Sequence, residues 1–246
     1  MFNIPMEVRS VCTLDDLNTS HFSKNKKTSN HSDINDVKEP EDVNEYNTIY
    51  NNITYHQKQS ANCKLVKGQN ITINKLSEHT DILKAIIKYN TNPKGNIDVL
   101  STVLFMLNKD GFVNNDNWFL FYNQLNSPDR SVQLMESTNN KSQIVNIDLL
   151  KISSFVSKIL FIATITEDNP NMYALNNIDS VVFSLFNSVN KEIICFPIDL
   201  KNINTISLLI GEFYLYNGVW KFKAIGEGIN EDLYKLCMRY GVNVEG

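Results

Sequence analysis

Residues 211–228 read Gly-Glu-Phe-Tyr-Leu-Tyr-Asn-Gly-Val-Trp-Lys-Phe-Lys-Ala-Ile-Gly-Glu-Gly, and this stretch decides the predicted fold. On both sides of Asn217-Gly218, successive side chains alternate between two sets, which is the period of a β-strand. The Asn-Gly dipeptide tolerates positive φ at both central positions of a tight hairpin turn. The stretch therefore predicts a β-hairpin, whose return strand has one aromatic face and ends at Gly226 and Gly228.

A short helix is predicted after the hairpin. Its apolar stripe at positions i, i+3, i+4 and i+7 consists of Leu233, Leu236, Cys237 and Tyr240. Asn230 is the predicted N-cap, because an amide side chain can accept from the first free backbone N–H groups. Gly241 fits the left-handed position that ends a helix.

Strand signals dominate from Cys63 up to the hairpin. The predicted strands cover residues 97–107, 118–122, 146–152, 158–166, 179–188, 192–199 and 203–215. Residues 82–89 fit both a strand period and a helical period, and we favour the strand, because the period of two fits at least as well. Many short strands with little helix predict an all-β (β-rich α+β) fold, a β-sandwich followed by the C-terminal helix.

Residues 1–61 differ from the rest of the chain. They are rich in Asn, Ser, Thr, Asp, Glu and Lys, and their apolar residues come singly. Such a segment buries too little apolar area to offset the entropy of ordering, so we predict a disordered or loosely ordered polar arm. Two interpretations stay open, a solvated tail and a peptide that orders on a partner. Residues 62–246 are the predicted β-sandwich domain.

Charge and composition bound the function. The net charge is −4 and the isoelectric point is near 5.6, which favours neither nucleic acid nor an anionic membrane as partner. Scattered cysteines are typical of a reducing compartment; they are Cys12, Cys63, Cys195 and Cys237. The first residues lack the pattern of a signal peptide, and the longest apolar run, 155–165, is too short to span a bilayer. These features predict a cytoplasmic protein.

Four blocks of the sequence resemble the tellurium-resistance TerD family, in the family's order. They are the hairpin 211–228, Cys-Lys-Leu-Val-Lys-Gly-Gln-Asn-Ile-Thr-Ile-Asn-Lys at 63–75, Trp-Phe-Leu-Phe-Tyr-Asn-Gln at 118–124 and Ser-Pro-Asp-Arg-Ser-Val at 127–132. The closing Tyr-Gly-Val-Asn-Val at 240–244 also resembles the family's end. The resemblance covers about residues 62–246 and implies a β-sandwich with short peripheral helices.

The resemblance also implies a calcium site built from two acidic stretches. Asp98 matches the first acid of one stretch, but Leu100 stands where its second acid is expected. Glu136 matches the other stretch, whose further acids and glycines are replaced by residues 139–143, Asn-Asn-Lys-Ser-Gln. Calcium prefers six to eight oxygen ligands, so two carboxylates form a degenerate site. Asp98 and Glu136 are the candidate metal ligands, and a weak Ca²⁺ site and a lost one stay open.

Catalytic residues are not predicted. A lone His79 lies in a polar turn, and no base stands beside a nucleophile. No Gly-rich phosphate loop is found, so no cofactor-binding residue is proposed. Asp110, Asp116 and Asp129 are interpreted as turn residues. The aromatic residues of 118–124 and of the hairpin are either a ligand platform or, as we favour, core.

The resemblance therefore implies a non-enzymatic stress-response and tellurium-resistance protein that binds protein partners, with Ca²⁺-linked assembly. An alternative is a small-ligand module of the cyclic-nucleotide-binding type, also described for this superfamily. The sequence leaves the stress, the partner and the oligomeric state open.

Overall fold

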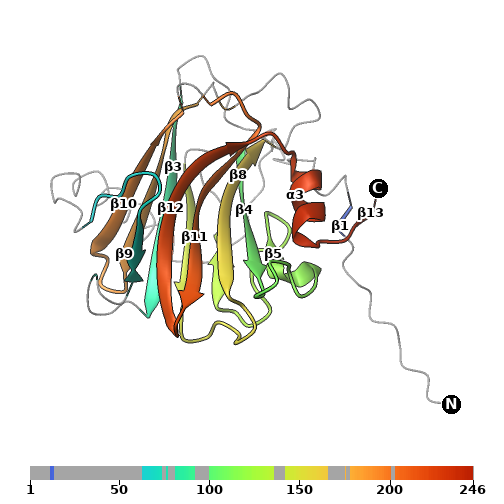
Figure 1. Cartoon of the computed structure of the whole chain (residues 1–246), viewed down its shortest axis with the longest axis horizontal. Helices are drawn as coiled ribbons and strands as arrows, with labels where there is room; N and C mark the ends of the chain where they lie inside the picture. The colour runs from blue at the N-terminus through green and yellow to red at the C-terminus, as the bar shows by residue number, and fades with distance from the viewer. Residues whose placement is uncertain are drawn as a thin grey trace, which may run out of the picture. The chain divides into compact units, whose positions relative to one another are not determined.

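Two antiparallel sheets that face each other make up the domain (Figure 1). The computed structural model describes residues 12–13, 63–73, 76, 81–91, 100–135, 142–165, 175, 178–200 and 203–245. The five-stranded sheet has the order β10 (Glu192–Asp199), β9 (Ile178–Asn187), β3 (Ile82–Thr91), β7 (Ser142–Asp148), β6 (Val132–Leu134). The six-stranded sheet has the order β2 (Asn70–Thr72), β12 (Val219–Ile229), β11 (Ser207–Tyr216), β8 (Lys158–Ile165), β4 (Leu100–Leu107), β5 (Phe119–Leu120). The predicted β-sandwich is confirmed.

A parallel pair lies outside both sheets. β1 (Cys12–Thr13) pairs with β13 (Val244–Glu245), and Cys12 is opposite Val244. No helix of the described residues is long and apolar enough to cross a membrane.

Strand β3 shows how alternation places the core. Leu83, Ala85, Ile87 and Tyr89 are all buried between the sheets, whereas Lys84 and Lys88 lie on the opposite face. A helix over the same residues would spread these apolar side chains around its circumference, so pairing with β7 and β9 selects the strand. The preference for a strand over residues 82–89 is confirmed.

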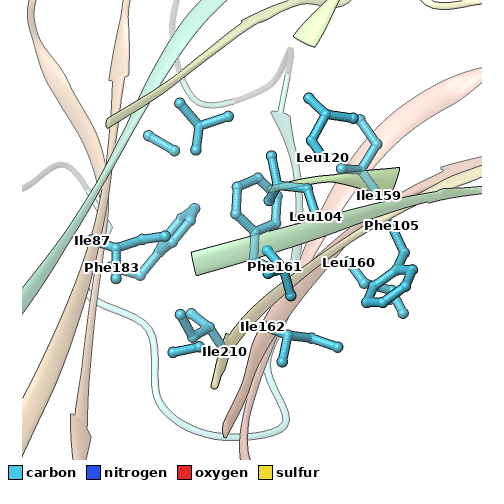
Figure 2. Packing of buried hydrophobic residues seen from close by; sticks show 14 of the residues in the cluster. Ile87, Leu104, Phe105, Leu120, Ile159, Leu160, Phe161, Ile162, Phe183 and Ile210 are labelled. Atoms are coloured by element: carbon cyan, nitrogen blue, oxygen red, sulfur yellow. The ribbon is translucent and has the colours of Figure 1, made fainter. Parts of the chain in front are cut away.

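Four phenylalanines join the two sheets. Phe183 of the five-stranded sheet stacks on Phe222 of β12, with ring centroids 4.6 Å apart. Phe183 also meets Phe161 of β8 edge-on at 5.4 Å, and Phe213 of β11 contacts both Phe161 and Phe222. Figure 2 shows Ile87 and Phe183 on one side of this core and Leu104 and Phe161 on the other. All four phenylalanine rings are fully buried.

The hairpin forms as predicted but its return strand is longer. Asn217 and Gly218 have φ of 49° and 77°, and Tyr216 is opposite Val219. The prediction that Gly226 and Gly228 end the strand is wrong, because β12 continues to Ile229. Gly226 has φ of 58° at a register shift between β11 and β12, so it forms a bulge inside the strand.

Helix α3 (Leu233–Tyr240) covers part of the outer face of the six-stranded sheet. Leu233, Leu236 and Cys237 are buried, and the Tyr240 ring lies 4.7 Å from that of Phe105 on β4. The predicted stripe is confirmed, and the helix ends at Gly241 with φ of 79°.

The N-cap of α3 differs from the prediction. Asp232 caps the helix instead of Asn230, because the Asp232 carboxylate accepts a 2.8 Å hydrogen bond from the Lys235 N–H. The Glu231 carbonyl is already bound by the Ser207 hydroxyl at 2.6 Å, which ties the chain to β11 until it reaches the cap.

Three predicted strands have other bounds. The strand predicted over 203–215 is β11, which begins only at Ser207 and ends at Tyr216. Trp118 belongs to a 3-10 helix, η3 (Asp116–Trp118), so the strand predicted over 118–122 shortens to β5. The Asn115 side chain caps η3 by accepting from the Asn117 N–H. The strand predicted over 146–152 is β7, which begins at Ser142 and ends at Asp148, where the chain turns.

Gly211 gives a direct test of the sandwich packing. A Cβ at this position would lie 2.7 Å from both the Lys223 carbonyl oxygen and the Phe222 ring. We expect Gly211→Ala to lower the free energy of unfolding by about 1–3 kcal/mol, as overpacked cores do. Urea denaturation measures the change, and Glu227→Ala, an exposed site on β12, serves as the control. An unchanged midpoint for Gly211→Ala would contradict this packing.

Candidate functional site

The ends of β3, β4 and β7 meet at one end of the sandwich. β3 ends at Thr91 and β4 begins at Leu100, so residues 92–99 connect the two sheets. β7 begins beside the end of β3, since Ser142 is opposite Lys88. The sequence places the two candidate calcium ligands in connections that begin or end at strands of this domain.

The two candidate ligands belong to the connections at this end. Asp98 lies between β3 and β4, and Glu136 lies between β6 and β7. Both fall outside the described residues, as does His79. Their assignment as metal ligands stays a prediction. Within the described residues, no group of three or more His, Cys, Asp or Glu side chains could hold a metal ion.

A buried hydroxyl pair fixes the sheets to each other below this end. The Tyr89 hydroxyl of β3 hydrogen-bonds the Thr102 hydroxyl of β4. Burial raises the pKa of Tyr89 well above its usual value, against the opposing effect of the Thr102 hydrogen bond. The phenol is therefore neutral, and it holds the end of β3 against the start of β4.

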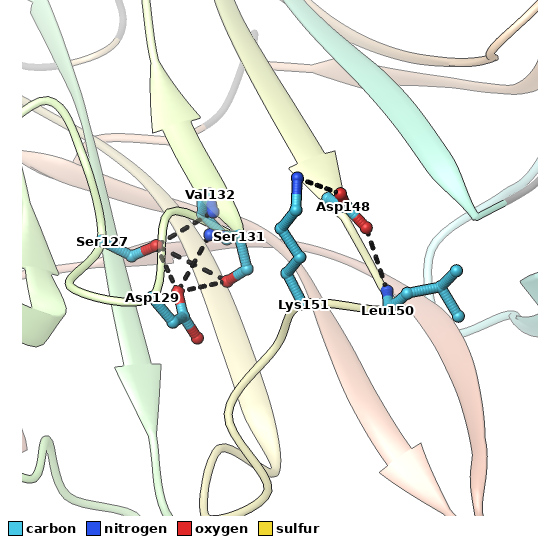
Figure 3. Close-up of polar contacts among 7 residues, drawn as sticks. All are labelled: Ser127, Asp129, Ser131, Val132, Asp148, Leu150 and Lys151. Atoms are coloured by element: carbon cyan, nitrogen blue, oxygen red, sulfur yellow. Dashed lines mark hydrogen bonds and ion pairs between the residues drawn. The ribbon is translucent and has the colours of Figure 1, made fainter.

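Asp129 is the most extensively bound carboxylate in the described loops. Its Oδ1 accepts from the Ser127 hydroxyl at 2.7 Å and from the Ser131 hydroxyl and N–H at 2.7 and 2.9 Å (Figure 3). Its Oδ2 accepts from the Ser153 N–H at 2.8 Å. Arg130, which lies between Asp129 and Ser131 in the sequence, has φ of 55°, and this left-handed conformation lets the chain fold around the carboxylate.

The charge of Asp129 is stabilised by these donors. Burial raises its pKa, but the hydrogen bonds from Ser127, Ser131 and Ser153 outweigh burial, so the pKa lies below its usual value. With four donors on two oxygens, this carboxylate fastens the start of β6 to the connection between β7 and β8. The interpretation of Asp129 as a turn residue is confirmed.

Other described carboxylates also fasten the backbone. Asp116 accepts from the Asn243 N–H at 2.8 Å, which joins η3 to the segment after α3. Asp148 accepts from the Leu150 N–H and pairs with Lys151 at 2.8 Å (Figure 3). Both carboxylates thus stabilise the fold, and Asp116 joins two segments that are far apart in the sequence.

The aromatic residues divide between core and surface. Phe119 and Phe121 are buried, and their rings stack at 5.0 Å beside Phe105. On the hairpin, Phe222 is core, whereas Tyr216 is 53% exposed. The preference for core and cross-strand pairing is thus confirmed for the phenylalanines. Tyr122 and Tyr216 are not core, since they are 37% and 53% exposed, although the Tyr216 ring contacts Lys221 across the hairpin.

The domain is similar in sequence to a known protein family. The TerD domain profile matches residues 62–240. The chain belongs to the TerD domain family. The tellurium resistance protein TerD of Serratia marcescens is 28% identical over 188 residues, which cover 73% of this chain and 97% of that relative. General stress protein 16U of Bacillus subtilis (strain 168) is 27% identical over 188 residues, with the same two coverages.

A solved structure supports the fold. The crystal structure of a protein of unknown function, 14% identical, superposes with a TM-score of 0.52 over 66% of this chain and 98% of its own. At that identity the likeness concerns the sandwich alone. The TerD domain of this chain and that protein share the arrangement of the sheets.

Sequence reasoning missed the long-range partners in this TerD domain. Ser153 lies 24 residues after Asp129, and Asn243 lies 127 residues after Asp116. Glu212 pairs with Lys158 of β8 at 3.0 Å, although Lys223 is the residue opposite it on β12. The tertiary fold brings such partners together from distant parts of the chain, so no local signal marks them.

The Asp129 carboxylate allows a pH test of the TerD domain. We expect Asp129→Asn to lower the free energy of unfolding at pH 7 by about 1–3 kcal/mol, because the amide group would face the Ser153 N–H. The folded-state pKa of Asp129 lies below the unfolded value of about 3.9. Ionised Asp129 therefore stabilises the folded state above that pH, and this stabilisation is lost as the pH falls through the folded-state pKa.

The difference between wild type and Asp129→Asn should therefore shrink in acid. Urea denaturation at pH 7 and below pH 4 measures it, with the exposed Asp110→Asn as matched control. A variant as stable as wild type at pH 7 would show that these hydrogen bonds contribute nothing net.

Proposed function

We propose that this chain is a non-enzymatic stress-response protein that acts in the cytoplasm by binding protein partners. The observation that carries the proposal is the match of the TerD domain over residues 62–240. It aligns with nearly the whole length of relatives named tellurium resistance protein TerD and general stress protein 16U. A third relative, from Clostridium acetobutylicum, is named chemical-damaging agent resistance protein B.

The geometry of the polar groups supports binding over catalysis. Every buried side-chain nitrogen or oxygen of the described residues has a hydrogen-bond partner. The Asp129 carboxylate is saturated by four donors, and Glu212 is paired with Lys158. The contacts of both carboxylates tie strands and loops of the domain together, which supports a structural role for them.

Survival and chemistry test the two parts of the proposal separately. We expect the full chain to raise the tellurite concentration at which a sensitive bacterial host forms colonies. Phe213→Asp, which places a charge at a fully buried site, should give no protection. Purified protein should leave the concentration of dissolved tellurite unchanged. Colonies no more resistant than those with Phe213→Asp would contradict the stress role, and consumption of tellurite would contradict the non-enzymatic one.

The calcium site of the family is degenerate in this proposal. Asp98 and Glu136 supply two carboxylates, and Leu100, which replaces a further acid, is part of β4. Ca²⁺ affinity falls as charged ligands are lost, and weak protein sites have Kd of about 10⁻⁴–10⁻³ M. Ca²⁺ is then a weakly held ion or one that the chain no longer binds.

Thermal melts measure what remains of the calcium site. With 1 mM Ca²⁺ and a Kd near 1 mM, binding stabilises the fold by only about 0.4 kcal/mol. We expect the midpoint to rise by about 1–2 °C at most relative to chelator, and Asp98→Asn with Glu136→Gln to remove even that rise. A rise of many degrees at micromolar Ca²⁺ in the wild type would show an intact site.

A further inference from the structure

The outer face of the six-stranded sheet is covered unevenly. Under α3, Phe105 of β4 and Leu160 of β8 are buried although both point away from the sandwich core. Toward the turn between β11 and β12, outward side chains are half-buried or exposed, and Tyr216 is 53% exposed. Among the described residues, the part of this face that α3 leaves uncovered thus lies around the hairpin.

Strand register fixes which side chains share this uncovered part. Thr72, Lys221, Tyr214 and Lys158 are opposite one another across β2, β12, β11 and β8. Lys223 follows Lys221 by two residues and is opposite Glu212. We define the hairpin face by these outward residues near the turn: Lys158, Tyr214, Tyr216, Lys221 and Lys223.

The hairpin face is positively charged on a chain whose net charge is −4. Glu212 is the acid in its midst, but its side chain is only 13% exposed and pairs with Lys158 at 3.0 Å. Glu212 is therefore paired with Lys158, and the positive charges of Lys221 and Lys223 dominate the rest of the hairpin face. Glu227, further along β12, lies beyond the bulge at Gly226 and opposite Leu209.

The two tyrosines add contact area and order one of the cations. The Lys221 ammonium lies 4.6 Å from the centroid of the Tyr216 ring, within the range of a cation–π interaction. Burial, Glu212 and Tyr216 raise the pKa of Tyr214, so its hydroxyl keeps its proton and can donate. Rigid aromatic side chains with a polar end are typical of binding surfaces.

We propose that the hairpin face binds an acidic, extended segment of a protein partner. Lys221 and Lys223 stand two residues apart on one face of β12, which is about 6.7 Å along a strand. Acidic residues at positions i and i+2 of an extended segment have the same spacing, so both carboxylates can meet both lysines. This inference rests on the proposed partner-binding function and names the class of partner.

A model peptide tests the pairing. The probe is a fluorescein-labelled peptide of ten residues that alternates Glu and Ser, titrated with the full chain while anisotropy is recorded. We expect saturable binding that weakens about tenfold in the double variant Lys221→Gln with Lys223→Gln. The matched control is Lys109→Gln with Lys191→Gln, two exposed lysines in other turns, and should bind as wild type does. Raising the salt from 50 to 300 mM should weaken wild-type binding more than that of the double variant.

Further variants and probes sharpen the outcome. Tyr216→Ser, at an exposed site, should weaken peptide binding without lowering the melting temperature. It serves as the second variant if the double substitution destabilises the fold. Three outcomes would overturn the proposal: no saturable binding, equal loss in the matched control, or tighter binding of a single-stranded oligonucleotide of equal charge.

Failure of this proposal is distinguishable from failure of the proposed function. A chain that protects the host from tellurite but does not bind the peptide would retain its stress role and lose this docking site. A chain that binds the peptide but gives no protection would show the reverse.

Discussion

The contact between the two sheets through Phe183, Phe222, Phe161 and Phe213 is the interaction on which the rest of this structure depends. Each fully buried ring removes enough apolar area from water to contribute about 1.5–3 kcal/mol. The rings come from β8, β9, β11 and β12, so they fix how one sheet is placed on the other. With the sheets fixed, the end of β3 lies beside the start of β4 and the start of β7.

Helix α3 divides the outer face of the six-stranded sheet into two unlike parts. β4 and β8 are buried on both faces from Thr102 and Ile159 onward, and α3 packs on their outer side, where the Tyr240 ring lies 4.7 Å from that of Phe105. Such strands lose the apolar–polar alternation, as the run Val-Leu-Phe-Met-Leu at 103–107 shows. β11 and β12 keep it near their turn, where alternate positions carry Tyr and Lys. One short helix thus separates a second layer of core from a surface that can bind.

The sequence predicted those features that depend on nearest neighbours. Asn217-Gly218 fixed the hairpin turn, because its positive φ values are a local property. Period two was sufficient for β3. The same period did not predict where β12 ends, because a glycine that forms a bulge within a strand and a glycine that ends a strand look alike in sequence. The partners of Asp129 and Glu212 depend on register between distant segments, which no local pattern encodes. The TerD motifs marked the calcium loops, but both candidate ligands lie outside the described residues.

The number of acidic residues in this domain does not tell how many carboxylates can bind a ligand, and this distinction matters for both proposals. Some carboxylates accept hydrogen bonds from backbone N–H groups and so stabilise the fold, as Asp129, Asp116 and Asp232 do. Such acids add to the net charge of −4 without adding to a calcium site. The lysines at 221 and 223 are different, because they stand on a strand whose backbone is already paired on both sides. Their charges are therefore available to a partner, and the hairpin face, rather than the acidic loops, is where charge can select what this domain binds.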